Sequence, residues 1–168
     1  MIFVAVGTQK FQMNRLLKEI DNCIERGDIT ESVFAQIGNS SYLPKNYKYS
    51  TFLCKEDFEK RVKECSLLIT HSGVATIITG LKFDKPVIVV PRLAKYGEHV
   101  DDHQLQIADS FQELNFVIKC QDESTLSEAI AEARSHKFDR YISQRDKMTE
   151  TIETFIDRLG VRKCRKWF

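Results

Sequence analysis

A short apolar run that leads directly into a glycine-containing polar turn is the feature that most constrains this chain. Residues Leu67–Thr70 have the composition of a buried strand, His71–Gly73 form the turn, and helical spacing begins at Val74. A second apolar run, Val87–Val90, follows the helix. A strand, a helix and a strand in this order predict a βαβ unit with parallel strands. Because the backbone N–H groups at the start of such a helix stabilise an anion, the turn predicts a phosphate site.

The same alternation continues along the rest of the chain. Apolar runs predict further strands at 1–6, 33–37, 49–53 and 116–118, and helical spacing predicts helices at 11–24, 55–65, 74–83, 100–114, 124–134 and 139–160. A basic, aromatic tail at 161–168 follows the last helix. This alternation predicts an α/β fold, a Rossmann-like parallel sheet with helices on both faces. Because no repeat or linker interrupts the pattern, residues 1–168 are predicted to form one domain.

Charge and cysteine content exclude several classes of protein. The 25 basic and 24 acidic residues nearly cancel, so we expect neither a nucleic-acid partner nor direct attraction to an anionic membrane. The five cysteines form no Cys-x-x-Cys pair, which argues against a disulfide framework or a structural zinc site and fits a reducing compartment. No apolar run approaches the ~18 residues of a membrane span. We therefore expect a cytoplasmic chain that reaches a membrane only through a partner.

Four polar segments follow the predicted strands, and parallel strands end at one edge of a sheet. These segments are Gly7–Gln9, Gly38–Ser40, His71–Gly73 and the longer loop Arg92–Gln104. Ligands of such folds bind beyond the carboxyl ends of the strands. The long loop carries carboxylates, amides and imidazoles, which suit the hydroxyl groups of a sugar. Together the four segments predict a site for a diphosphate linked to a sugar.

Simpler interpretations of the same residues stay open at this point. Gly7 also makes a tight turn, Ser72 is also a candidate N-cap, and Asp101 or Asp102 is a candidate cap of the next helix. The glycines of Gly-x-Gly-x-x-Gly do not follow Gly7, and the chain has no P-loop. NAD and ATP sites are therefore disfavoured.

Metal binding is not predicted either. Glu98, His99, Asp101 and His103 are suitable ligand types, but their spacing matches no standard zinc pattern. The sequence therefore predicts no metal site and no cofactor.

Four blocks spread over nearly the whole chain resemble a known family. They are Phe3–Gln9, Gln36–Ser40, Thr70–Gly73 and Val89–Gln104, of which the last is the most specific. In these blocks the chain resembles the carboxy-terminal, UDP-sugar-binding domain of family 28 glycosyltransferases. The resemblance is strongest to the stand-alone form, the soluble half of split enzymes. Examples are the PssE-type subunit of bacterial capsular and exopolysaccharide synthesis and its eukaryotic counterpart in dolichol-linked oligosaccharide assembly.

The resemblance implies half of a GT-B glycosyltransferase, in which this domain binds the donor and a facing domain binds the acceptor. The missing half would be a membrane-associated PssD-like subunit that recruits this chain to the inner face of the cell membrane. The implied reaction transfers a hexose, with inversion, from a UDP-sugar to a polyprenyl-diphosphate-linked saccharide. Galactose is the first expectation for the hexose and N-acetylglucosamine the second.

Two other functions stay open beside this one. The chain could be a non-catalytic subunit that stabilises or activates the partner transferase. It could also be a nucleotide-sugar epimerase or dehydrogenase, which the missing dinucleotide fingerprint disfavours. For the transferase, the catalytic base is expected on the partner, with His71 and Asp101 as the fallback candidates on this chain.

The resemblance also implies roles for individual residues. Uracil would lie near Phe52 and Leu53, the diphosphate at Ser72–Thr76, and the sugar near His103 and Gln104. The complete predicted set of substrate-binding residues is Gly7, Thr8, Asn39, Phe52, Leu53, His71, Ser72, Gly73, Val74, Ala75, Thr76, Arg92, Glu98, His103 and Gln104.

Overall fold

One six-stranded parallel sheet forms the centre of the molecule, for which a computed structural model describes residues 1–120, 122 and 125–158. The strand order is β3-β2-β1-β4-β5-β6, and each neighbouring pair runs parallel. In this doubly wound order the chain builds outward from one side of β1 and then from the other. The strands are β1 (Ile2–Ala5), β2 (Val33–Gln36), β3 (Lys48–Ser50), β4 (Leu67–Thr70), β5 (Val87–Val89) and β6 (Ile118–Lys119).

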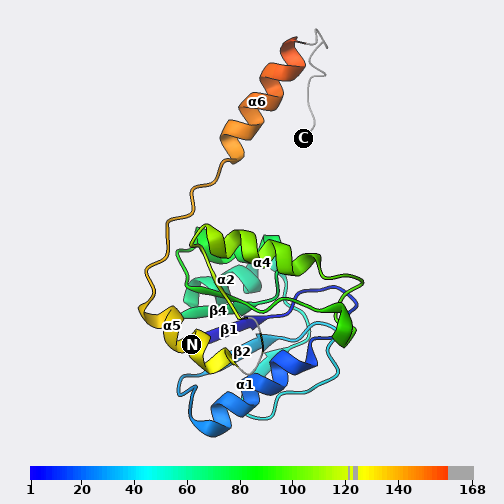
Figure 1. The fold of residues 1–168 in the computed structure, drawn as a ribbon, viewed down its shortest axis with the longest axis vertical. Helices are drawn as coiled ribbons and strands as arrows, with labels where there is room; N and C mark the ends of the chain where they lie inside the picture. The colour runs from blue at the N-terminus through cyan, green and yellow to red at the C-terminus, as the bar shows by residue number, and fades with distance from the viewer. Residues whose placement is uncertain (121, 123–124, 159–168) are drawn as a thin grey trace.

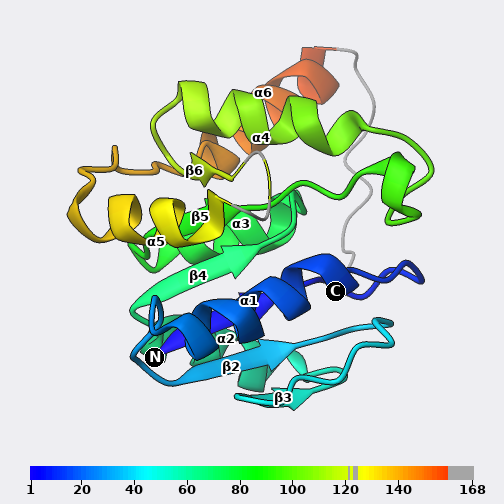
Figure 2. The same ribbon diagram turned by 60° about the horizontal axis from the view of Figure 1, so that its bottom comes forward.

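Helices cover both faces of the sheet (Figure 1, Figure 2). The helices α1 and α5 share one apolar core with the sheet, and α2, α3 and α4 share the other. The predicted Rossmann-like α/β class is therefore confirmed. The helices are α1 (Asn14–Arg26), α2 (Lys55–Glu64), α3 (Val74–Lys82), α4 (His103–Glu113), α5 (Leu126–Ser135) and α6 (Arg145–Arg158), with a 3-10 turn η1 (Ala94–Tyr96) before α4.

The central strand β1 separates the two cores because its side chains alternate between the faces. Ile2 and Val4 belong to the core under α1 and α5, whereas Phe3 and Ala5 belong to the core on the other face. All four side chains are fully buried. The Phe3 ring meets the ring of Phe58 in α2 edge-on, with 5.3 Å between the centroids. A strand buried on both faces is apolar at each position, which is why β1 was recognisable in the sequence.

The terminal helix begins later than predicted. Within the described residues helix α6 covers Arg145–Arg158, and residues 139–144, where the prediction began, are not helical. Two contacts hold that segment against the loop after α4: the Asp139 N–H donates to the Asn115 carbonyl at 3.0 Å, and the rings of Tyr141 and Phe116 meet edge-on at 5.8 Å. Tertiary contacts thus override the helical spacing of 139–144. Residues 159–168, with the predicted tail, lie outside the described residues.

Two other helices begin later than predicted. The helix expected from residue 11 begins at Asn14, and the helix expected from residue 100 begins at His103. The side chains before these starts pack against each other instead, since the rings of Phe11 and His99 lie 5.4 Å apart. This contact joins the loop after β1 to the loop after β5.

Helix α6 differs from the other helices because it extends away from the sheet (Figure 1). No residue between 145 and 158 is buried, and the exposed apolar side chains are Met148, Ile152, Phe155 and Ile156. Among the described residues, no helix combines the length and the apolar character that are needed to cross a lipid bilayer.

Candidate functional site

The carboxyl ends of four strands lie side by side in the sheet. Gln36 of β2 pairs with Ala5 of β1, Ala5 pairs with Thr70 of β4, and Thr70 pairs with Val89 of β5. The loops that follow these strands therefore leave the sheet at the same edge (Figure 2). This edge includes the switch between β1 and β4, where ligands of doubly wound sheets bind. The predicted convergence of the polar segments is confirmed.

The His71 ring lies between two glycine turns at this switch. A Cβ atom at Gly7 would lie 2.6 Å from His71 Cε1, and a Cβ atom at Gly73 would lie 2.3 Å from His71 Nε2. Gly7 also has a φ of +82°, which few other residues adopt. Both positions therefore require glycine, because the imidazole occupies the space of any larger side chain.

The same ring is buried and neutral. His71 is 9% exposed, and its Nδ1 atom lies 3.3 Å from both the Ala5 carbonyl oxygen and Thr70 Oγ1. Burial, reinforced by the charge of Arg92, lowers the pKa of His71 to about 4. Because a carbonyl only accepts, the contact with Ala5 favours a proton on Nδ1 and leaves the lone pair on Nε2.

A pocket of about 460 Å³ opens beside this ring at the same edge. It brings together the loop after β1, the start of α2 and the start of α3. A larger cavity of about 550 Å³ lies beside Met1 and Val33 at the amino ends of the strands, away from the polar turns. The residues that line the pocket beside His71 are Gly7, Thr8, Gln9, Gln36, Leu53, Lys55, Phe58, His71, Gly73, Ala75 and Thr76.

The predicted set of substrate-binding residues lacks three polar residues of this pocket, Gln9, Gln36 and Lys55. Lys55 begins α2 and contributes a cation, and Gln36 is the last residue of β2. Gln36 ends an apolar run, so the position of a polar residue at the end of a strand could have identified it, whereas Lys55 lies beyond the end of β3 and carries no such signal. The predicted uracil contact Phe52 is 47% exposed next to the pocket-lining Leu53, and Val74 is 42% exposed at the start of α3.

The backbone N–H groups at the start of α3 are not capped by a side chain among the described residues. Gly73 occupies the N-cap position, and in the part of the chain that the structure describes no side chain caps this helix. The interpretation of Ser72 as the N-cap is therefore wrong. Ser72 is only 1% exposed, and its hydroxyl has no hydrogen-bond partner among the described residues. A buried hydroxyl without a partner costs free energy, so a ligand that bonds it is favoured at this point.

Two other predicted contacts, Arg92 and Glu98, are buried inside the protein. The Arg92 guanidinium donates through Nη1 to the Phe11 carbonyl at 3.0 Å and to the Glu98 carbonyl at 3.1 Å, and through Nη2 to the Val6 carbonyl. The Glu98 carboxylate pairs with Arg15 of α1 at 2.9 Å and accepts the Leu93 N–H at 3.1 Å. These contacts fix the Arg92–Gln104 loop to β1 and α1. Their role in ligand binding stays a prediction.

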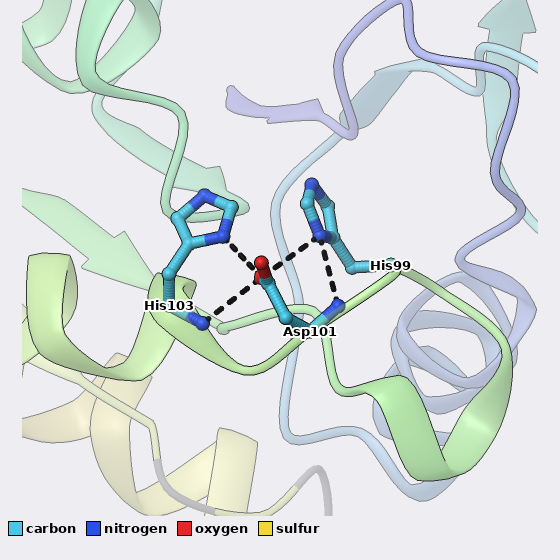
Figure 3. Close-up of side chains that lie close together, drawn as sticks. All are labelled: His99, Asp101 and His103. Carbon is cyan, nitrogen blue, oxygen red and sulfur yellow. Dashed lines mark hydrogen bonds and ion pairs between the residues drawn. The ribbon is translucent and has the colours of Figure 1, made fainter.

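The end of the Arg92–Gln104 loop divides into a buried part and an exposed part. Gln104 is 4% exposed, and its Oε1 accepts the Arg92 N–H at 3.1 Å. His103 and Asp101 are exposed, and Asp101 Oδ1 accepts the His103 N–H at 3.2 Å and contacts His103 Nδ1 (Figure 3). Bonding from His103 lowers the pKa of Asp101 below its ordinary value, so this carboxylate is a weak general base.

The two candidate caps of α4 differ, because Asp101 accepts the N–H of His103, the first residue of the helix, whereas Asp102 does not cap it. Asp102 occupies the N-cap position of α4, but its carboxylate accepts the Ala94 N–H at 2.8 Å and does not cap the helix. Asn39, another predicted contact, donates its side-chain N–H to the Gln9 carbonyl at 2.9 Å. It therefore ties the loop after β2 to the loop after β1.

Comparisons with known proteins agree with this geometry. The profile of the Glycosyltransferase family 28 C-terminal domain matches residues 1–159. The UDP-N-acetylglucosamine transferase subunit ALG13 of Candida albicans is 34% identical over 67 residues, which cover 40% of this chain and 22% of that protein. The subunit of the same name in Debaryomyces hansenii is 23% identical over 147 residues, which cover 79% of this chain and 66% of that protein. The match thus covers less than two thirds of each relative's length.

Solved structures share the fold at low sequence identity. The solution structure of ALG13 aligns with a TM-score of 0.55 at 19% identity, over 90% of this chain and 93% of that chain. MurG of Acinetobacter baumannii aligns with a TM-score of 0.53 at 18% identity, over 92% of this chain and 49% of that chain. The glycotransferase of kitacinnamycin aligns with a TM-score of 0.59 at 17% identity, over 80% of this chain and 34% of that chain. These likenesses support the fold alone.

Proposed function

Because the chain belongs to the family of the glycosyltransferase family 28 C-terminal domain, we propose that it is the donor-binding subunit of a UDP-sugar-dependent hexosyltransferase. The observation that carries this proposal is the uncapped start of α3, where Gly73, Ala75 and Thr76 line the pocket at the carboxyl edge. A diphosphate supplies the hydrogen-bond acceptors and the negative charge that such a helix start favours.

The pocket offers complementary groups for the rest of the donor. Lys55 supplies a positive charge on the side of α2, and Leu53 and Phe58 supply apolar surface for a base. His71 is neutral and places no second cation in the pocket. The proposed arrangement places uracil toward α2, the diphosphate at Ser72–Thr76, and the sugar toward His103 and Gln104.

The proposed reaction is a single displacement with inversion. Negative charge develops on the departing UDP, so donors at the start of α3 would bind it more tightly in the transition state than in the substrate. The acceptor hydroxyl needs a general base, and this domain offers poor candidates: Asp101 has a lowered pKa, and His71 is buried. We therefore propose that a membrane-associated, acceptor-binding partner supplies the base and presents a lipid-linked saccharide at the inner face of the membrane.

Different observations support two different UDP-sugars as the donor substrate. The resemblance to PssE-type subunits supports UDP-galactose, a PssD-like partner and a role in capsular or exopolysaccharide synthesis. The relatives named UDP-N-acetylglucosamine transferase subunits support UDP-N-acetylglucosamine instead. The two sugars differ by an epimeric hydroxyl and an acetamide, so pocket geometry decides between them.

The test combines binding and transfer. UDP titrated into the isolated chain is expected to bind weakly at the carboxyl edge, and Lys55→Ala is expected to weaken binding while the exposed Lys137→Ala is not. Co-expression with a candidate membrane partner, followed by a panel of labelled UDP-sugars on a lipid-linked acceptor, then identifies the donor. Strong transfer by the isolated chain would contradict the division of labour, and UDP bound at another edge would contradict the site.

An accessory role is favoured by one observation. Arg92, Glu98 and Gln104 already bond other protein groups, as expected for a loop whose function is structural. In that case the domain stabilises a self-sufficient transferase. Unchanged activity of the reconstituted pair after His103→Ala and Lys55→Ala would support this role over donor binding.

A further inference from the structure

The loop between η1 and α4 gathers three side chains that the proposed function does not explain together. His99, Asp101 and His103 each offer one ligand atom, and these atoms all lie within 4.8 Å of one another (Figure 3). Figure 3 shows both imidazole rings directed at the same carboxylate. We propose that these three residues form a binding site for Zn²⁺ or a chemically similar transition-metal ion.

The spacing of the three groups suits such an ion. His99 Nδ1 lies 3.3 Å from Asp101 Oδ1, and His103 Nδ1 contacts the same oxygen. Ligand atoms bonded to tetrahedral zinc at about 2.0–2.2 Å lie about 3.3–3.5 Å from each other. His103 Nδ1 and Asp101 Oδ1 lie closer together than this, so these two exposed side chains would have to rotate apart to admit the ion.

The donor set favours a transition metal over magnesium or calcium. Two imidazole nitrogens and one carboxylate oxygen are ligands that zinc binds readily, whereas magnesium and calcium prefer oxygen alone. Three protein ligands leave the fourth tetrahedral position open to water or to an oxygen of another molecule. The Asp101 and His103 side chains are 59% and 46% exposed, so a water molecule could reach an ion bound between them.

The surrounding protein holds the three ligands in place. The His99 side chain is 8% exposed, and its ring packs against Phe11 at 5.4 Å and against His103 edge-on at 4.6 Å. The backbone is anchored on both sides of the cluster by the buried Glu98 with Arg15 and by Gln104, which accepts the Arg92 N–H. Such anchoring reduces the ordering cost of binding a metal.

The spacing His-x-Asp-x-His explains why the sequence alone did not predict this site. In a helix or a strand, residues at these offsets would not all converge on one point, and the sequence matches no standard zinc motif. The irregular backbone before α4 makes the convergence possible. The proposal concerns metal binding itself and does not depend on the proposed glycosyltransferase function.

The test is a titration of the untagged chain with zinc chloride, in which calorimetry measures the binding. We expect one ion per chain, and we expect Asp101→Asn and His103→Ala to weaken binding at least tenfold. The matched control is His136→Ala, which removes an imidazole near Glu132 in α5 and leaves the cluster intact. Unaltered zinc binding in both cluster variants would overturn the proposal, as would equal binding of magnesium chloride.

Substitution with Co²⁺ distinguishes the cluster from the cysteines. Cys54 is exposed and is an alternative ligand for a soft metal. Visible bands of tetrahedral cobalt that disappear in Asp101→Asn support the proposal, and a thiolate-to-cobalt charge-transfer band that persists in that variant overturns it. Because His99 is packed against Phe11, His99→Gln is used only after its metal-free melting temperature matches that of the wild type.

Discussion

The loop after β4 and the loop after β5 meet at the same edge of the sheet but are built in opposite ways. The turn His71–Gly73 depends on glycines and a buried ring, and it leaves the buried Ser72 hydroxyl without a hydrogen-bond partner among the described residues and the start of α3 uncapped. The loop Arg92–Gln104 depends on long polar side chains, and most of these bond other parts of the protein. The first loop is therefore ready for a ligand, whereas the second mainly holds the edge together.

The largest effect should come from breaking the second loop. Glu98→Ala removes a fully buried carboxylate and leaves the partly buried Arg15 without its 2.9 Å ion pair. Loss of one partner of a buried ion pair costs about 3–5 kcal/mol, which urea denaturation measures. Arg26→Ala is the matched control, because the Arg26 side chain is 49% exposed in its pairs with Glu19 and Asp28 and its loss should cost under about 1 kcal/mol. Equal losses in the two variants would contradict the structural role of this loop.

A smaller effect should appear in the first loop as a dependence of stability on pH. The folded-state pKa of His71, about 4, lies below the ordinary imidazole value of about 6.5. As the pH falls, the unfolded chain takes up a proton that the native chain excludes. The free energy of unfolding is therefore highest above about pH 6.5 and decreases as the pH falls toward 4. The loss totals roughly 3 kcal/mol.

Urea unfolding at about pH 7.5 and about pH 4.5 measures this dependence. In His71→Gln the free energy of unfolding should fall less between these two pH values than in the wild type. In His136→Gln, a substitution at a surface position, it should fall by as much as in the wild type. If His71→Gln left the pH dependence of the free energy of unfolding unchanged, the ring would not be held neutral by burial.

The close fit of the His71 ring predicts a third effect. Gly73→Ala places a Cβ atom 2.3 Å from His71 Nε2, and overpacking of this kind costs about 1–3 kcal/mol. It should also weaken UDP binding at least tenfold if the start of α3 holds the diphosphate. In the double variant with His71→Ala the ring is gone, so the two stability losses should not add. Additive losses in the double-mutant cycle would show that the clash is not with the ring.

The smallest effect on stability should come from Ser72→Ala. The hydroxyl has no partner among the described residues, so its removal breaks no hydrogen bond within them and should not lower the free energy of unfolding. UDP binding should nevertheless weaken, because the ligand loses a buried donor. Ser127→Ala in α5 serves as the control for both measurements. A large loss of stability with normal UDP binding would reverse the contrast between the two loops.

Much of the fold was predictable because burial on both faces makes the central strands apolar throughout. The runs at β1 and β4 and the polar turns after them were recognised from composition and periodicity alone. The terminal helix was overestimated because helical spacing also occurs in 139–144, where Asp139 and Tyr141 make tertiary contacts instead. Similarly, the sequence could not show that Ser72 does not cap α3 or that Lys55 lines the pocket.

The order of apolar runs and polar turns determined by itself the parallel sheet and the edge where its loops meet, and four residue blocks carried the resemblance to the family. Only the tertiary structure decided which polar residues of those loops are available to a ligand. The reason is that hydrogen bonds such as those of Arg92 and Glu98 join residues distant in sequence, and local spacing carries no record of them. The convergence of His99, Asp101 and His103 depends in the same way on an irregular backbone.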